Sequence, residues 1–136
     1  MNQETFSNIV YQYLIQQHPL LLENLAFKPD KSFECSLMSP TGEFSIWVAT
    51  FDCEITIGMD DPEHTSGAHT HMNFYGDEVD EQTEALTEYL QDIFKNKLVF
   101  IHSSLSGYTW TKDLVETISE KDDNETIKFF TWTGEI

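Results

Sequence analysis

Three consecutive segments between residues 33 and 59 alternate apolar and polar side chains with a period of two. In a β-strand this period places one set of side chains on a single face, so each segment has a side suited to a buried core. Turn-forming residues at 39–42 separate the first two segments. The pattern therefore predicts a three-stranded antiparallel meander whose core side chains are Phe33, Cys35 and Leu37, then Phe44, Ile46 and Val48, then Cys53, Ile55, Ile57 and Met59.

Two helices are expected beside this meander. Residues 3–16 and 77–96 both place apolar side chains at helical spacing, and the pattern is clearer in the second segment. Apolar segments at 97–102, 108–112 and 126–133 predict further strands. The order of helix, three strands, helix and two or three strands predicts an α+β fold, in which a mostly antiparallel sheet packs against two helices.

The cysteines and the amino-terminal residues indicate a reducing compartment. Cys35 and Cys53 fall on the two outer strands of the predicted meander, about 9–10 Å apart by the spacing of neighbouring strands. That distance is too long for a disulfide bond. The amino-terminal residues show no basic stretch followed by an apolar run, and no segment reaches the roughly 20 apolar residues of a membrane span. We therefore expect a cytoplasmic protein with free thiols.

The chain is strongly acidic, with a formal net charge of −17 at pH 7. Its 136 residues and 40% hydrophobic content predict one domain over residues 1–136, so the charge belongs to a folded surface. All seven basic residues are lysines, and the absence of arginine removes the forked donor that suits phosphate groups. Such a surface repels nucleic acids and anionic membranes. A basic protein is the expected partner.

Acidic residues are also concentrated locally, because residues 60–92 contain ten acids and no lysine or arginine. Runs of charge often serve solubility alone, but charges at this density repel one another and favour a binding surface for a cationic partner. On the helix predicted at 77–96, the side opposite the apolar one carries Asp77, Glu81, Glu84, Glu88 and Asp92. The aromatic residues that could anchor a partner there are Trp47, Phe74, Tyr75 and Tyr89.

A histidine pair within residues 60–76 supports an alternative function. This turn-rich segment predicts a loop, or a short strand at 69–74 on which the two histidines would point the same way. With neighbouring side chains the pair could hold zinc, in a small metal-binding protein or a hydrolase. Histidines in a loop can equally form hydrogen bonds that fix the loop to a sheet. The candidate metal ligands are His64, His69 and His71, with Asp60 or Asp61 as a further ligand.

Four short motifs give the chain a resemblance to a known group of proteins. They are a Ser-Pro-Thr-Gly-Glu turn at 39–43, a Glu-Ile-Thr-Ile-Gly strand at 54–58, the His-Thr-His segment at 69–71 and a Gly-Tyr-Thr-Trp strand at 107–110. In these motifs the chain resembles small acidic bacterial α+β proteins that act as immunity factors in polymorphic toxin systems. The resemblance implies a cytoplasmic protein without catalysis of its own, which binds and blocks a toxin, often a basic nuclease. It assigns no binding residues, because immunity families do not share one interface.

Overall fold

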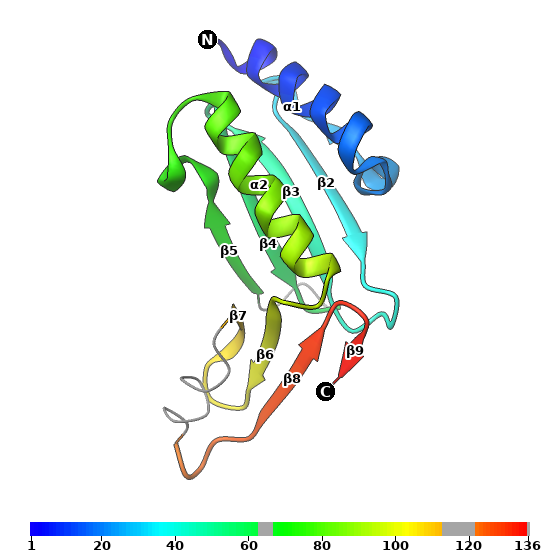
Figure 1. Cartoon of the computed structure of the whole chain (residues 1–136), viewed down its shortest axis with the longest axis vertical. Helices are drawn as coiled ribbons and strands as arrows, with labels where there is room; N and C mark the ends of the chain where they lie inside the picture. The colour runs from blue at the N-terminus through cyan, green and yellow to red at the C-terminus, as the bar shows by residue number, and fades with distance from the viewer. Residues whose placement is uncertain (63–66, 113–121, 136) are drawn as a thin grey trace.

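The computed structural model describes residues 1–62, 67–112 and 122–135, and within them the chain has the predicted α+β fold. The strands of these residues form two antiparallel sheets, one of five strands and one of four. The α-helices pack on the larger sheet, and the smaller sheet extends from its lower end (Figure 1).

The five-stranded sheet has the predicted meander at its centre. β2 (Phe33–Met38), β3 (Ser45–Phe51) and β4 (Glu54–Asp60) pair with one another in antiparallel fashion. β1 (Ala26–Phe27) and β5 (Gly67–His71) extend the sheet at its two edges, in the order β1-β2-β3-β4-β5. The meander is therefore confirmed. Of the short strand considered at 69–74, residues 69–71 belong to β5, whereas residues 72–74 lie in a 3₁₀ helix.

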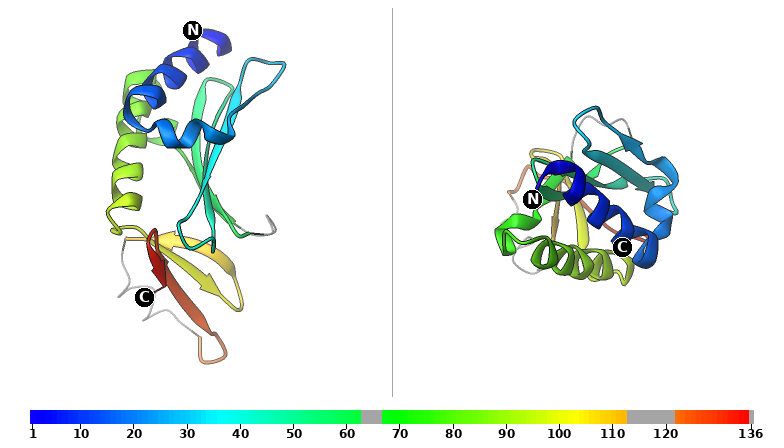
Figure 2. Two further views of the ribbon diagram at one scale, coloured as in Figure 1. Left: turned by 90° about the vertical axis from the view of Figure 1, so that its right-hand side faces the viewer. Right: turned by 90° about the horizontal axis from the view of Figure 1, so that it is seen from above.

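The two α-helices of the described residues cover one face of this sheet, as Figures 1 and 2 show. They are α1 (Gln3–Gln17) and α2 (Val79–Phe94), close to the predicted bounds. Two short 3₁₀ helices, η1 (Pro19–Asn24) and η2 (Met72–Tyr75), follow α1 and precede α2 respectively. No helix of the described residues has the length and apolar character needed to cross a membrane. The core between helices and sheet includes Val10, Leu14, Ile46, Ile57, Leu86 and Leu90, all fully buried.

The later strands form a second sheet instead of joining the first. β6 (Val99–Ser103) lies between β7 (Gly107–Thr111) and β8 (Ile127–Thr131), and β9 (Gly134–Glu135) pairs with β8. The short turn after Ser103 lets β6 pair with the strand that follows it directly. Alternating apolar residues indicate which side chains face a core but not which strand lies next to which. The sequence pattern is therefore the same for one sheet and for two.

Aromatic side chains join the two sheets through one continuous core. The ring centre of Phe44, just before β3, lies 4.1 Å from that of Phe100 on β6 and 5.9 Å from that of Trp132. Trp132 also contacts Phe94 at the end of α2, with ring centres 5.2 Å apart. Contacts between aromatic rings stabilise a core in addition to the free energy gained by burying the rings.

A two-residue turn joins β3 to β4, and both α-helices bind it. Its central residues Asp52 and Cys53 have φ angles of 54° and 55°, as in the type I′ turns of tight hairpins. Gln3 of α1 accepts a hydrogen bond from the Cys53 amide at 2.7 Å, and Gln82 of α2 donates one to the Cys53 carbonyl at 3.3 Å. The side-chain oxygen Oε1 of Gln82 also accepts a hydrogen bond from the Ile55 amide at 2.8 Å. We call this pair of contacts on Cys53 the glutamine clamp.

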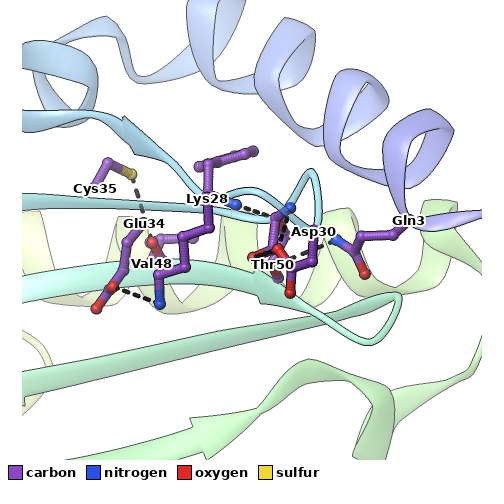
Figure 3. Close-up of polar contacts among 9 residues, drawn as sticks. Gln3, Lys28, Asp30, Glu34, Cys35, Val48 and Thr50 are labelled. Carbon is purple, nitrogen blue, oxygen red and sulfur yellow. Dashed lines mark hydrogen bonds and ion pairs between the residues drawn. The ribbon is translucent and has the colours of Figure 1, made fainter.

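The two cysteines are free, as their predicted separation implies. Cys35 is buried, and its thiol donates a hydrogen bond to the Val48 carbonyl at 3.7 Å (Figure 3). Figure 3 also shows the side chain of Gln3, which donates a hydrogen bond to the Thr50 carbonyl at 3.3 Å. Burial raises the pKa of the Cys35 thiol to about 12. Cys53 differs from its predicted place, because it lies in the turn and not in the strand.

Replacing Gln82 with methionine, which has a similar size but no amide, should destabilise the fold. The substitution leaves the Ile55 amide and the Cys53 carbonyl without these partners, at a cost of about 2–3 kcal/mol. Gln91 is exposed on the same helix, so Gln91→Met should change the free energy of unfolding by less than about 0.5 kcal/mol. Urea denaturation measures both variants, and equal stabilities would contradict the role given to the clamp.

Candidate functional site

The acidic residues predicted as one stripe are not equivalent in the structure. Glu81, Glu84 and Glu88 are exposed on successive turns of α2. Asp77 is also exposed, but it lies two residues before the helix begins. Asp92 lies near the other end of the helix, and only 23% of its side chain is exposed. On the helix itself, the three glutamates are therefore the members of the predicted stripe that are exposed to solvent.

Asp92 is already paired within the chain. Its carboxylate lies 2.6 Å from the Lys112 ammonium, which also lies 5.4 Å from the centre of the Tyr89 ring. Lys112 thus contacts a carboxylate and an aromatic face together, and both contacts are attractive for a cation. The chain itself supplies the cation that Asp92 binds.

The 3₁₀ helix η2 places two aromatic residues beside the glutamates of α2. Met72 is buried and anchors η2, while Phe74 and Tyr75 are 86% and 50% exposed. Tyr75 lines a hollow of about 170 Å³ together with Glu81, Glu84, Ala85 and Glu88. We call the set of Phe74, Tyr75, Glu81, Glu84 and Glu88 the acidic–aromatic face.

Tyr89 lies beneath this face and contacts Tyr75. It is half-buried, its hydroxyl lies 3.1 Å from that of Tyr75, and its ring centre lies 5.9 Å from that of Trp110 on β7. The contact with Trp110 ties α2 to the second sheet. Tyr89 therefore positions Tyr75 and offers little surface of its own.

Trp47, the remaining aromatic candidate, lies elsewhere. It stands on the face of the larger sheet opposite the helices, where it packs flat on its cross-strand neighbour Gly58. A Cβ atom at Gly58 would lie only 2.3 Å from the Trp47 ring, so glycine is required at this position. The Trp47 indole donates to the Asp60 carboxylate at 3.3 Å. Asp60, predicted as a possible metal ligand, therefore interacts with Trp47.

The histidine pair lies on β5, on this same side of the sheet. The ring centres of His69 and His71 are 5.1 Å apart, and the Glu54 carboxylate lies 2.5 Å from His71 Nδ1. Sequence reasoning missed Glu54, although it shares a face of β4 with Thr56, the cross-strand partner of His71. His64 lies outside the described residues. Within residues 1–62, 67–112 and 122–135, no three histidine, cysteine or acidic side chains form a group that could hold a metal ion.

Tyr89 should ionise at an unusually high pH. Burial, with a smaller contribution from the Tyr75 hydroxyl, raises the pKa of the Tyr89 phenol to about 12. Because this value lies above that of an unfolded tyrosine, about 10, folding favours the protonated phenol. The resulting stability is present in full below the unfolded pKa and is lost as the pH rises through the folded one. Ultraviolet titration of the wild-type protein against Tyr89→Phe isolates this phenol, and an ordinary midpoint would contradict its burial.

Comparison of the chain with protein-family models, with curated proteins and with solved structures finds no match. Two arrangements among the described residues are therefore considered for a function on their own chemistry. They are the acidic–aromatic face and the histidine pair with Glu54.

Proposed function

We propose that this chain is a non-catalytic binding protein that holds a cationic protein partner on its acidic–aromatic face. The observation that carries the proposal is the hollow in which Tyr75 meets Glu81, Glu84 and Glu88. A lysine or arginine side chain entering this hollow would meet carboxylates and an aromatic ring, both of which attract a cation. Phe74 stands beside it with 86% of its surface exposed, which suits an apolar anchor at an interface.

The contacts of Lys112 support this view, because they show the same chemistry inside the chain. Lys112 pairs with Asp92 and lies over the ring of Tyr89. The hollow offers glutamates with Tyr75 where this internal site offers an aspartate with Tyr89. We infer that a partner's cation would occupy the hollow much as Lys112 occupies its own site.

The charge of the whole chain supports the same kind of partner. A net charge of −17 generates a field that attracts basic proteins over distances longer than a direct contact. Such fields mainly raise the rate of association, whereas the contacts at the face set the rate of dissociation. The net charge of the chain would therefore speed the approach of a basic protein, and the acidic–aromatic face would hold it once bound.

We further propose that the partner is a toxin domain and that the chain acts as its immunity protein in the cytoplasm. A basic nuclease needs lysine and arginine side chains to bind phosphates. A protein that covers those side chains with carboxylates would exclude the nucleic acid without any catalytic step. The resemblance of four short motifs to immunity proteins motivates the choice of a toxin over other basic proteins.

Reversing two charges of the face should slow association with the basic partner. Glu84→Lys/Glu88→Lys is expected to reduce the association rate about tenfold or more at low salt, with a weaker dependence on salt than in the wild type. Glu81 is left unchanged because its carboxylate accepts a hydrogen bond from the Glu78 amide and caps α2. The matched control is Glu23→Lys/Asp123→Lys, which makes the same change in net charge at exposed positions elsewhere.

The experiment begins with immobilised wild-type and variant proteins in lysate from the native cell. Proteins retained by the wild type and by the control, but not by the face variant, are purified for kinetic measurements. A basic protein whose toxicity is relieved by co-expression of this chain would support the proposal in full. Retention of the same proteins by all three chains, or of acidic proteins only, would exclude the face as the binding site.

Phe74→Ser should weaken binding of that partner without affecting the fold. A large exposed anchor typically contributes about 1–3 kcal/mol to binding, whereas its loss from the free surface changes stability by less than about 0.5 kcal/mol. Phe51 is a second exposed phenylalanine, at 66%, and lies outside the face, so Phe51→Ser is the control. Isothermal calorimetry gives the affinities, and an equal effect of both substitutions would argue against Phe74 as an anchor.

A further inference from the structure

His69 and His71 form a pair that the acidic–aromatic face does not use. Both side chains are exposed, and they stand two positions apart on β5, so they project from the same side of the strand. They line a hollow of about 450 Å³ together with Glu54, Thr70, Asn73 and Phe74. The pair is therefore accessible from solvent and has space in front of it.

The orientation of His71 is fixed by the neighbouring strand. Its Nδ1 lies 2.5 Å from the Glu54 carboxylate and 2.9 Å from the Thr56 hydroxyl. A carboxylate beside Nδ1 holds the proton on that nitrogen, which leaves the lone pair on Nε2. A carboxylate that orients a histidine in this way is the usual support of a metal-binding imidazole.

The spacing of the two rings suits a shared metal ion. With a metal–nitrogen distance of about 2.0–2.1 Å, the centre of each ring lies about 3.2 Å from the ion. Two ligands at an angle of about 90° to 110° then have ring centres about 4.5–5.2 Å apart. The observed separation of 5.1 Å lies within this range.

We propose that His69 and His71 bind one divalent ion of the late first-row transition metals, such as Ni²⁺ or Zn²⁺. Two imidazoles select these ions over Mg²⁺ and Ca²⁺, which prefer oxygen ligands. Glu54 acts as a positioning residue through His71, and water completes the coordination in the hollow. The strongly negative surface raises the local concentration of cations and assists binding. The proposal is independent of the protein partner.

Calorimetric titration of the chelator-treated protein with Ni²⁺ alone and with Zn²⁺ alone tests the site. One ion per chain is expected, and His69→Ala or His71→Ala should each weaken binding at least tenfold. Glu54→Gln should weaken it about tenfold, the lower end of the range for a group that orders a metal ligand. His102→Ala removes a histidine of the second sheet that stacks near Tyr108, and it should leave affinity unchanged. In nuclear magnetic resonance spectra, the ring-proton resonances of His69 and His71 should shift together as Zn²⁺ is added.

Three results would overturn the proposal. The first is no binding by the wild-type protein at millimolar metal. The second is wild-type affinity in both His69→Ala and His71→Ala, with their folding verified by circular dichroism. The third is a loss of metal affinity in His64→Ala as large as that in His69→Ala. This result would replace the two-histidine site with the three-histidine site expected from the sequence. Unchanged affinity in Glu54→Gln would remove its positioning role.

Discussion

The glutamine clamp on Cys53 is the contact on which the arrangement of the helices depends. Gln3 and Gln82 lie 50 and 29 residues from Cys53 along the chain, yet both bind its peptide groups. The turn that they hold contains two non-glycine residues with positive φ, a conformation that costs roughly 1–2 kcal/mol for each residue. Hydrogen bonds from both helices offset that cost. The clamp also fixes the start of α2, and so the direction in which Glu81, Glu84 and Glu88 point.

The larger sheet separates two kinds of chemistry. Both helices lie on one side of it (Figure 2). That side carries the glutamates of α2, and strand pairing places Trp47 and the histidine pair on the opposite side. Phe74 is the residue between them, because it belongs to the acidic–aromatic face and also lines the hollow in front of the histidines. A ligand in that hollow would therefore lie near the ring that the proposed partner would contact. The two proposed sites are distinct in ligand chemistry but adjacent in space.

The parts of the fold that the sequence predicted are those governed by local periodicity. The meander and both α-helices follow from the spacing of residues such as Ile55, Ile57, Leu86 and Leu90. The division into two sheets depends on strand pairing and on the stacking of Phe44 against Phe100, which no local pattern encodes. The same limit applies to the glutamine clamp, because Gln82 resembles any polar residue of a helix until its partners are known.

The sequence suggested which residues to consider for the candidate site, but it did not indicate which of them pair with one another. The sequence grouped Asp92 with the glutamates, since all of them share one side of a helix. Lys112 lies 20 residues further along and pairs with Asp92 through the tertiary fold, so the helical pattern alone could not show it. Glu54 was missed for a similar reason, because its link to His71 crosses from β4 to β5. Phe74 and Tyr75 were candidates because aromatic residues next to acids are visible in the sequence, whereas their exposure is known only from the structure.

The positions of the three tryptophans make the molecule suitable for fluorescence measurements on separate regions. Trp132 is buried where the two sheets meet, Trp110 contacts Tyr89 beneath the acidic–aromatic face, and Trp47 lies on the opposite side of the larger sheet. Each indole has a different environment, so its emission responds to a different event. Chains that retain a single tryptophan would distinguish separation of the sheets, occupation of the helical face and changes near the histidines, without any added label.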